Sequence, residues 1–434
     1  MSLEKLNAYC TSKLDALKAK GTWKGSENII EKIIAPDWVI KGKLPNSSED
    51  KNFGPRYLLV GNDEPHLLMN SNSYLGLTLH PEVAEAEEKG VRNFGTGPGA
   101  VRFISGTYKP HIELERRLAK FHGREAAMIY SAAYAAIMGI LPLLITENTL
   151  VVSDQLNHNC IINAIRLSRP ASKEIYQHLD MNELESILSA YTAANNNRRD
   201  SAIKRVLVVT DGIFSMRGDH APLDEIADIC QKYENGFEEG IITVADDSHG
   251  VGAFGKTGRG TEEYTQSRVD ILIATLGKAL GVNGGYVVTT GPVIEYLRET
   301  SPLYVYSNPI TPSEALAATK SLEILESNEG LERLKKIRCL TSRFSIGLGK
   351  LGFETIAGEH PVTPLVVRDT NKTTALIQYL LQHRILATGL NYPIVPKGDE
   401  EIRFQINANH TTRDIDYILD ILKHFSVLPL SHCS

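Results

Sequence analysis

Residues 271–281, ILIATLGKALG, decide how the rest of the chain is interpreted. They overlap an apolar, partly β-branched run at 269–274, which predicts a buried strand. Lys278 follows this strand between Gly277 and Gly281. A lysine at the end of a buried strand is costly unless it is solvated, paired or chemically used, and small neighbours let a flat ligand approach the backbone. The segment suits a lysine that condenses with an aldehyde, although a surface lysine in a glycine-rich turn fits this stretch alone equally well.

The overall composition is that of an ordinary globular protein, with 434 residues, 42% hydrophobic and 23% charged, and a formal net charge of −6. This length allows a large core and two or three domains. The acidic balance, with basic residues spread along the chain, argues against a nucleic-acid partner. Five scattered cysteines predict a reducing compartment such as the cytoplasm, with no disulfide framework and no metal site. We expect no signal peptide and no transmembrane segment, because no apolar run is long enough.

Short apolar runs alternate with helical patterns from Leu67 onward. Strands separated by helices predict an α/β fold with a mostly parallel sheet, covered on both faces. Ligands of such sheets bind outside the carboxyl ends of the strands. The predicted strands are 127–130, 149–153, 206–210, 241–245, 269–274 and 286–289, and the helices between them include 111–121, 181–190 and 222–233.

The two ends of the chain have a different texture. Leucines at helical spacing predict an amphipathic helix at 3–17 that packs on a partner or on the body of the protein, and a polar loop or irregular arm follows at 41–56. Beyond Pro312 we expect helices at 313–326 and 331–351, strands around 362–367, 385–388 and 402–406, and a last helix at 412–425. The predicted organisation is an N-terminal helix and arm at 1–66, a large α/β domain at 67–311 and a smaller α+β domain at 312–434, which the N-terminal segment joins.

Two of the predicted strand ends carry possible ligand-binding turns. Residues 131–139, SAAYAAIMG, open a helix, where free backbone N–H groups can bind phosphate and Tyr134 could stack or donate, although most such turns reflect only tight packing. In residues 244–252, VADDSHGVG, Asp246 ends a strand and His249 follows it. A carboxylate there can keep a heterocyclic nitrogen protonated, and the histidine could reach a ring oxygen. A helix-capping carboxylate and a core histidine are the alternatives.

Two further positions are open to two interpretations. His158, in LNHNC at 156–160, could lie flat over a ring or be a structural histidine. Arg403, in IRFQ at 402–405, alternates with Ile402 and Phe404, so it faces away from them. If those two pack in the core, Arg403 faces the cleft between domains and can bind a substrate carboxylate; otherwise it lies on an exposed edge strand.

Together these segments resemble the α-oxoamine synthases, a family of fold-type I enzymes that use pyridoxal 5'-phosphate (PLP). The resemblance runs from about Asn70 to Phe425. It rests on NSNSYLGL at 70–77, VRFISGT at 101–107, HIELE at 111–115, DGIFSMRGDHAPL at 211–223, DDSHGVGAFGKTGRG at 246–260, TLGKALG at 275–281, SPLYVYSNPITP at 301–312 and YPIVPKGDEEIRF at 392–404. It implies a large domain with a seven-stranded-type, mostly parallel sheet that binds PLP.

The resemblance also implies a role for each matching residue. Lys278 would bind the cofactor aldehyde and later move the substrate α-proton. Asp246 would pair with the pyridine nitrogen, His249 with the phenolic oxygen, and His158 would stack on the ring. Ala133 and Tyr134 match the phosphate turn, Thr275 matches a hydroxyl donor to the phosphate, and Ser215 would lie near the phenolic oxygen. Asn72 and Arg403 would bind the amino-acid carboxylate. Ser307 matches a phosphate contact from a second subunit, which implies a homodimer with shared active sites.

The implied reaction joins a small α-amino acid to an acyl-CoA. The nearest resemblance is to the glycine C-acetyltransferase branch, which condenses glycine with acetyl-CoA to a 2-amino-3-oxo product. GDHAPL is more similar to 8-amino-7-oxononanoate synthases and serine palmitoyltransferases, which take longer acyl-CoA with alanine or serine. Ile137 stands where many relatives carry asparagine, so acyl length and amino acid stay open. A catalytically idle PLP-fold regulator is the non-enzyme alternative, which the intact lysine, aspartate and histidine disfavour.

Overall fold

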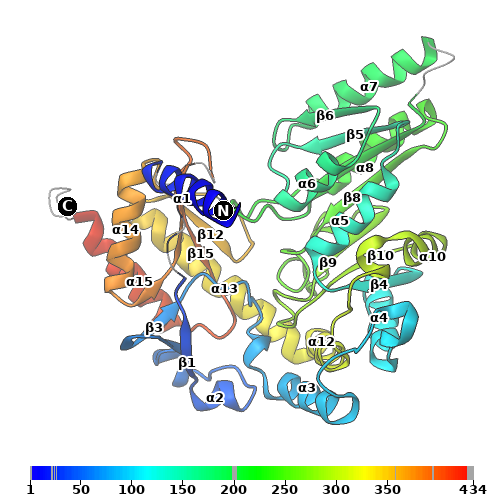
Figure 1. Cartoon of the computed structure of the whole chain (residues 1–434). Coiled ribbons are helices and arrows are strands. Elements are labelled where there is room, and N and C mark those ends of the chain that lie inside the picture. The colour runs from blue at the N-terminus through cyan, green and yellow to red at the C-terminus, as the bar shows by residue number, and fades with distance from the viewer. Residues whose placement is uncertain are drawn as a thin grey trace.

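The computed structural model describes residues 2–20, 23, 25, 27–197, 203–356, 358–392 and 395–427. Two sheet-containing parts lie side by side (Figure 1). One is built on a seven-stranded sheet, and the other holds both ends of the chain. The helices α12 (Pro312–Leu325) and α13 (Asn328–Lys350) lead from the first part into the second.

The seven-stranded sheet has the order β4-β10-β9-β8-β7-β5-β6. β10 is antiparallel to both of its neighbours, and all the other pairs are parallel. This sheet confirms the predicted α/β fold with a mostly parallel sheet. In sheet order the strands are Ala126–Tyr130, Gly285–Thr289, Ile271–Thr275, Ile241–Asp246, Arg205–Asp211, Thr149–Asp154 and Ser172–Tyr176.

Helices cover both faces of this sheet, which explains why its central strands are continuous apolar runs. On β5, Leu150 and Val152 belong to one hydrophobic cluster and Val151 to another on the opposite face. The first cluster includes side chains of α4 (Lys109–His122), α7 (Met181–Asn197), α8 (Leu223–Tyr233) and α12; the second includes side chains of α5 (Ala133–Leu144), α6 (Asn159–Leu167) and α10 (Gly291–Thr300).

The sequence predicted six strands of this sheet and missed the seventh, β6. Its five residues, SKEIY, lie at the sheet edge, where Lys173 and Ile175 are exposed. An edge strand buries too few side chains to produce a clear apolar run.

The second part contains a four-stranded sheet of order β11-β12-β15-β14 and the helices α13, α14 (Thr370–Gln382) and α15 (Thr412–Val427). A third hydrophobic cluster joins them, with Phe344 of α13 packed edge-on against Phe404 of β15. The strands are Glu354–Thr355, Val362–Val366, Glu401–Gln405 and Thr388–Leu390 in sheet order.

Residues 30–68 form three strands that the sequence did not reveal. They build a sheet of order β1-β2-β3-β13, with strands Ile30–Ile34, Arg56–Leu59, Asn62–Leu68 and Ile385–Leu386. β1 is exposed along its whole length and β3 begins with the polar run NDEPH, so neither shows an apolar alternation. The predicted loop at 41–56 is irregular apart from the 3-10 turn Glu49–Lys51 before β2 begins.

This sheet ties the N-terminal segment to the C-terminal part, because β3 pairs in parallel with β13. The predicted domain boundary at 66/67 therefore falls within β3, and the boundaries remain a proposal. The single strand expected at 385–388 is two short strands in different sheets, β13 and β14, because the chain passes from one sheet to the other at Ala387.

The N-terminal helix α1 (Ser2–Ala19) forms as predicted, and its apolar side chains at Leu3, Leu6, Leu14 and Leu17 are exposed. Across the described residues, no helix combines the length and apolar character needed to cross a membrane. The remaining helices are α2 (Asp37–Ile40), α3 (Pro81–Phe94), α9 (Thr261–Thr265) and α11 (Pro302–Val305), with a π-helical turn at Arg102–Gly106.

Candidate active site

A cavity of about 240 Å³ opens at the carboxyl ends of the central strands of the large sheet. Asp211, Asp246 and Thr275 are the last residues of β7, β8 and β9. Most of the residues predicted for one site meet here. The cavity is lined by Ala132, Ala133, Tyr134, His158, Cys160, Asp211, Ile213, Ser215, Asp246, Ser248, His249, Thr275 and Lys278.

Lys278 lies in a tight turn after β9. Gly281 closes the turn by donating its N–H to the Lys278 carbonyl at 3.0 Å, with a positive φ of 71°. A side chain at Gly281 would collide with the Thr78 backbone, 2.7 Å from the ideal Cβ position. Burial lowers the pKa of the Lys278 amine, and Asp246 and Asp211 oppose that effect. The lowered pKa enlarges the fraction of neutral amine, which is the nucleophilic form.

Two carboxylates lie beside the lysine, on neighbouring strands. Asp211 and Asp246 are paired in register where β7 and β8 end. Asp246 accepts the Ser248 N–H at 3.1 Å, and Asp211 accepts the His158 N–H at 3.0 Å. The second oxygen of Asp211, Oδ1, is buried without a hydrogen-bond partner, and burial followed by the charge of Asp246 raises the Asp211 pKa well above its usual range. Such a pair can hold a cationic ring nitrogen.

His158 caps α6 and keeps its ring at the cavity. Its Nδ1 accepts the Cys160 N–H at 3.3 Å and lies 2.8 Å from the Cys160 sulfur. That sulfur is in turn 3.8 Å from Oδ2 of Asp246. Burial raises the pKa of Cys160, so the thiol stays protonated and can donate.

His249 begins a chain of hydrogen-bonded polar side chains that reaches Asn72 and Gln405. Its Nδ1 lies 2.7 Å from the Tyr74 hydroxyl, which also lies 3.2 Å from Oδ1 of Asn72. Gln405 donates its side-chain amide to the same Asn72 oxygen. Burial lowers the pKa of His249 well below its usual value, so the ring is neutral. Because Tyr74 occupies Nδ1, Nε2 is the atom left for a ligand.

Arg403 approaches from the second part of the molecule. Ile402 and Phe404 are fully buried in the third cluster, so Arg403 faces the other way, as the alternation predicts. β15 lies between β12 and β14, which excludes the exposed edge strand. Arg403 donates Nη1 to the Ser215 carbonyl at 2.9 Å, while its buried Nε has no partner. Within the described chain no carboxylate forms an ion pair with it, so its charge is available to a ligand.

The first turn of α5 offers backbone donors at the cavity. Its N-cap residue is Ala132, which has no side-chain acceptor for the first N–H groups. β10 passes directly beneath, since a Cβ on Gly285 would lie 2.1 Å from the Ala133 nitrogen. Unpaired N–H groups at a helix start bind anions such as phosphate.

Three of the residues predicted to contact the phosphate have other contacts or positions in the single chain. Thr275 donates its hydroxyl to the Gly284 carbonyl at 3.0 Å, so its proton is engaged within the chain. The Tyr134 hydroxyl contacts Asn159 at 3.4 Å and accepts from Asn163 at 2.9 Å. Ser307 follows α11 and is not among the cavity residues of its own chain.

Comparison with known proteins agrees with this geometry. Residues 64–422 match the family described as aminotransferase class I and II. The chain is 37% identical over 365 residues to 8-amino-7-oxononanoate synthase of Fervidobacterium nodosum, covering 83% of this chain and 89% of that one. It is 36% identical over 418 residues to the mitochondrial 2-amino-3-ketobutyrate coenzyme A ligase of Homo sapiens, covering 96% and 91%. In fold it is similar to a serine palmitoyltransferase of Sphingomonas wittichii, with a TM-score of 0.82, 24% identity, and 98% and 99% coverage.

The chain belongs to the α-oxoamine synthase family. It is therefore a PLP-dependent transferase that C-acylates an amino acid. The cavity fits PLP on three structural observations: the orphaned oxygen of Asp211, the uncapped start of α5 above the closely approaching Gly285, and the half-buried amine of Lys278.

Several residues that line the cavity of this α-oxoamine synthase, or contact residues of the site, were missed in the sequence. Asp211 ends a predicted strand as Asp246 does, so the same strand-end argument would have found it. Gln405 lies two residues beyond Arg403 and shares its face, which the alternation could also have shown. Tyr74 and Cys160 carry no local signal, because their roles depend on contacts with residues far along the chain.

The segment YPIVPKGDEEIRF at 392–404 includes Pro393 and Ile394, which lie outside the described residues.

Proposed function

We propose that this enzyme condenses glycine with acetyl-CoA to give a 2-amino-3-oxo product. The observation that carries the proposal is Lys278, an amine of lowered pKa in the strand-end cavity with Asp246 beside it. The match to the human 2-amino-3-ketobutyrate coenzyme A ligase over 96% of the chain supports the choice of glycine and acetyl-CoA.

Each site residue then has a proposed task. Bound PLP supplies a ring into which the electrons of the substrate α-carbon can spread, and Asp246 keeps its pyridine nitrogen protonated. Lys278 would hold the cofactor aldehyde, and its neutral amine would be the base that removes the α-proton of the amino acid. His158 would stack on the ring, Nε2 of His249 would bond the phenolic oxygen, and Ser215 would lie near that oxygen. The N–H groups of Ala133 and Tyr134 would hold the phosphate, and the Thr275 hydroxyl would join them by exchanging its hydrogen bond to the Gly284 carbonyl for one to the phosphate.

The amino-acid carboxylate is the proposed ligand of Arg403 and Asn72. The partnerless Nε of Arg403 supports this, as does Asn72, whose oxygen already accepts from Gln405 and so leaves its amide N–H₂ to donate. A guanidinium and an amide together would fix the orientation of the amino acid in the cavity.

We further propose a homodimer in which Ser307 completes the phosphate site of the neighbouring subunit. The exposed apolar side chains of α1 support a second copy, as do Phe103 and Ile104, which are 66% and 68% exposed. A cytoplasmic location rests on the cysteines: Cys10, Cys160, Cys230 and Cys339 are free thiols, and Cys433 lies outside the described residues.

A longer-chain synthase is the second candidate, acting on a pimeloyl- or palmitoyl-type CoA with alanine or serine. It is favoured by the 37% identity to the Fervidobacterium enzyme and by the GDHAPL segment at 218–223.

A substrate panel decides between the two candidates. The PLP-loaded enzyme is mixed with glycine, alanine or serine and with acetyl-, pimeloyl- or palmitoyl-CoA; release of free CoA gives the rate, and mass spectrometry identifies the product. We expect the highest kcat/KM for glycine with acetyl-CoA. A higher value for alanine with pimeloyl-CoA, or serine with palmitoyl-CoA, would establish the second candidate. No turnover, together with no visible band on adding PLP, would favour the idle regulator.

A further inference from the structure

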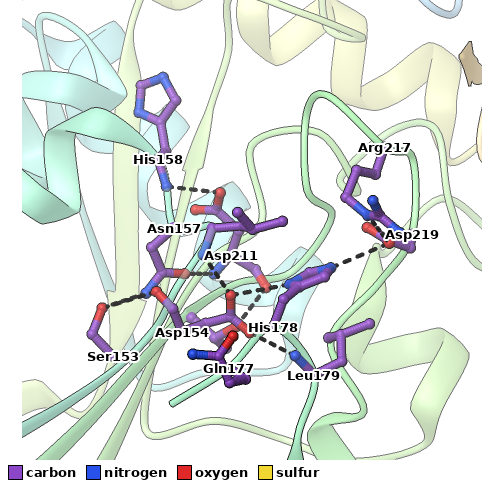
Figure 2. A network of polar contacts seen from close by, with 12 residues as sticks. Ser153, Asp154, Asn157, His158, Gln177, His178, Leu179, Asp211, Arg217 and Asp219 are labelled. Atoms are coloured by element: carbon purple, nitrogen blue, oxygen red, sulfur yellow. Dashed lines mark hydrogen bonds and ion pairs between the residues drawn. The ribbon is translucent and has the colours of Figure 1, made fainter. Parts of the chain in front are cut away.

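A second polar cluster lies behind the cavity, and the proposed reaction does not use it. Figure 2 shows His178 between two carboxylates. Its Nδ1 is 3.1 Å from Oδ1 of Asp154, and its Nε2 is 3.2 Å from Oδ2 of Asp219. His178 sits between β6 and α7, so it bridges two segments that belong to other parts of the sheet.

The first carboxylate belongs to the segment that carries His158. Asp154 ends β5, and its Oδ1 also accepts the Leu156 N–H at 2.8 Å. Asn157 fixes the same segment by donating to the Val209 carbonyl at 2.7 Å and accepting the Asp211 N–H at 2.8 Å. Asp154 and Asn157 together hold the segment that places His158 at the cavity.

The second carboxylate belongs to the loop that carries Ser215. Arg217 donates Nε to Asp219 Oδ2 at 2.7 Å, and Phe214 donates its N–H to the Asp219 carbonyl at 3.0 Å. The Ser215 carbonyl accepts from Arg403 in the second part of the molecule. Through Asp219, His178 thus reaches the loop against which Arg403 rests.

We propose that His178, as an imidazolium between Asp154 and Asp219, is a positioning residue that holds the loops of His158 and Ser215 at a fixed separation across the cavity. The inference rests on the proposed function for the tasks of His158 and Arg403. Its geometric content does not depend on which amino acid or acyl-CoA is used.

Only the charged ring satisfies both contacts. An imidazolium donates from both nitrogens, whereas a neutral histidine would turn a lone pair toward one of the carboxylates. Asp154 of β5 and Asp219, with Arg217 behind it, are the charged groups that face the ring, and Phe214 packs edge-on against it with ring centroids 4.4 Å apart. Burial alone would lower the pKa of His178, but the two carboxylates outweigh it and raise that pKa to about 9.

The backbone beside His178 is strained, as expected where surrounding contacts fix a position. Leu179 has a positive φ of 57°, which is uncommon for a bulky side chain. Its N–H donates to Oδ2 of Asp154 at 3.1 Å. Asp154 therefore binds both the ring of His178 and the strained residue that follows.

The test compares His178→Gln with His383→Gln. A glutamine amide can donate to one carboxylate but turns its oxygen toward the other. His383, half-buried at the C-cap of α14 and bonded through its ring to the Tyr379 carbonyl at 2.9 Å, does not line the cavity and is the matched control. For His178→Gln we expect PLP affinity to fall by about tenfold, the size of a coupling within one polar network. The visible circular dichroism of bound PLP should weaken, and the KM of the best amino acid should rise while the KM of acyl-CoA stays unchanged.

Two results would overturn the inference. If His178→Gln lowers only the melting temperature and leaves PLP affinity, circular dichroism and the amino-acid KM unchanged, His178 is structural. The second result concerns the wild-type holoenzyme, so it does not depend on the variant folding. Histidine ¹⁵N NMR should show both ring nitrogens of His178 protonated up to about pH 9. Titration near the usual histidine pKa of 6.5 would contradict the proposed imidazolium between Asp154 and Asp219. PLP affinity and NMR need no substrate, so a failure of the proposed substrate pair would be separate from a failure here.

Discussion

Single residues of the cavity owe their proposed chemistry to burial and to close neighbours. Lys278 loses solvation, which lowers its pKa, while Asp246 keeps a defined place at the end of β8. Asp247, the next residue, is oriented differently: its carboxylate accepts the Thr261 N–H and hydroxyl, both at 2.7 Å, away from the cavity lining. The two adjacent aspartates can therefore be separated by experiment.

Asp246→Asn should lower PLP affinity and reduce kcat by at least about a hundredfold, because a neutral amide cannot keep the pyridine nitrogen protonated. Asp247→Asn is the control, expected to lower stability but to retain PLP. Equilibrium dialysis of PLP and steady-state kinetics measure both variants. Near-normal rates in Asp246→Asn would assign Asp246 a structural task only.

At the scale of elements, the site depends on where strands and helices end. Arg403 is directed by the alternation along β15, with Ile402 and Phe404 in the core. The phosphate donors of α5 are directed by the close passage of β10 at Gly285. Substitutions at Arg403 and at Gly285 therefore test the two placements separately.

Arg403→Lys should raise the amino-acid KM about tenfold or more and also lower kcat, because an ammonium cannot replace the bidentate, planar contact. The KM of acyl-CoA and the PLP content should barely change. Arg343→Lys, on an exposed ion pair with Asp416, is the control. An unchanged amino-acid KM in Arg403→Lys removes Arg403 from the site.

Gly285→Ala should weaken PLP binding and destabilise the fold by about 1–3 kcal/mol, since the new Cβ would overlap the backbone of Ala133 and push the start of α5. Gly349→Ala, where a Cβ meets nothing within 4 Å, should preserve PLP affinity. Thermal unfolding with and without PLP measures both effects. Equal PLP affinity in the two variants would show that α5 does not hold the phosphate.

The elements differ in how far the sequence predicts them, and burial explains the difference. β7, β8 and β9 are apolar on both faces, so they were visible as runs and their ends located Asp246 and Lys278. β6 and β1 bury little and left no such signal. The link from His249 to Asn72 runs through Tyr74, which lies 175 positions from His249 in the sequence, so no local pattern reveals it.

At the scale of the molecule, the cavity lies beside a contact between the two parts, since Ser215 and Arg403 come from different ones. The parts are also tied by the N-terminal segment through β3 and β13. Ser307 is half-buried and is not among the cavity residues of its own chain, and the apolar side chains of α1 are exposed; a second subunit would use both.

Sedimentation of the PLP-bound protein should give about twice the chain mass of 47.9 kDa. Ser307→Ala should lower PLP affinity without dissociating the dimer, because it removes one phosphate donor and no apolar contact. A fully active monomer would contradict the shared site.

The central claim is that PLP is bound through Lys278, and borohydride reduction tests it most directly. The reduced holoenzyme is digested, and the fluorescent peptide is identified by mass spectrometry. We expect a single labelled peptide that contains Lys278, and no label in Lys278→Ala although this variant remains folded. A label on any other lysine, or persistence of the label in Lys278→Ala, would contradict the account.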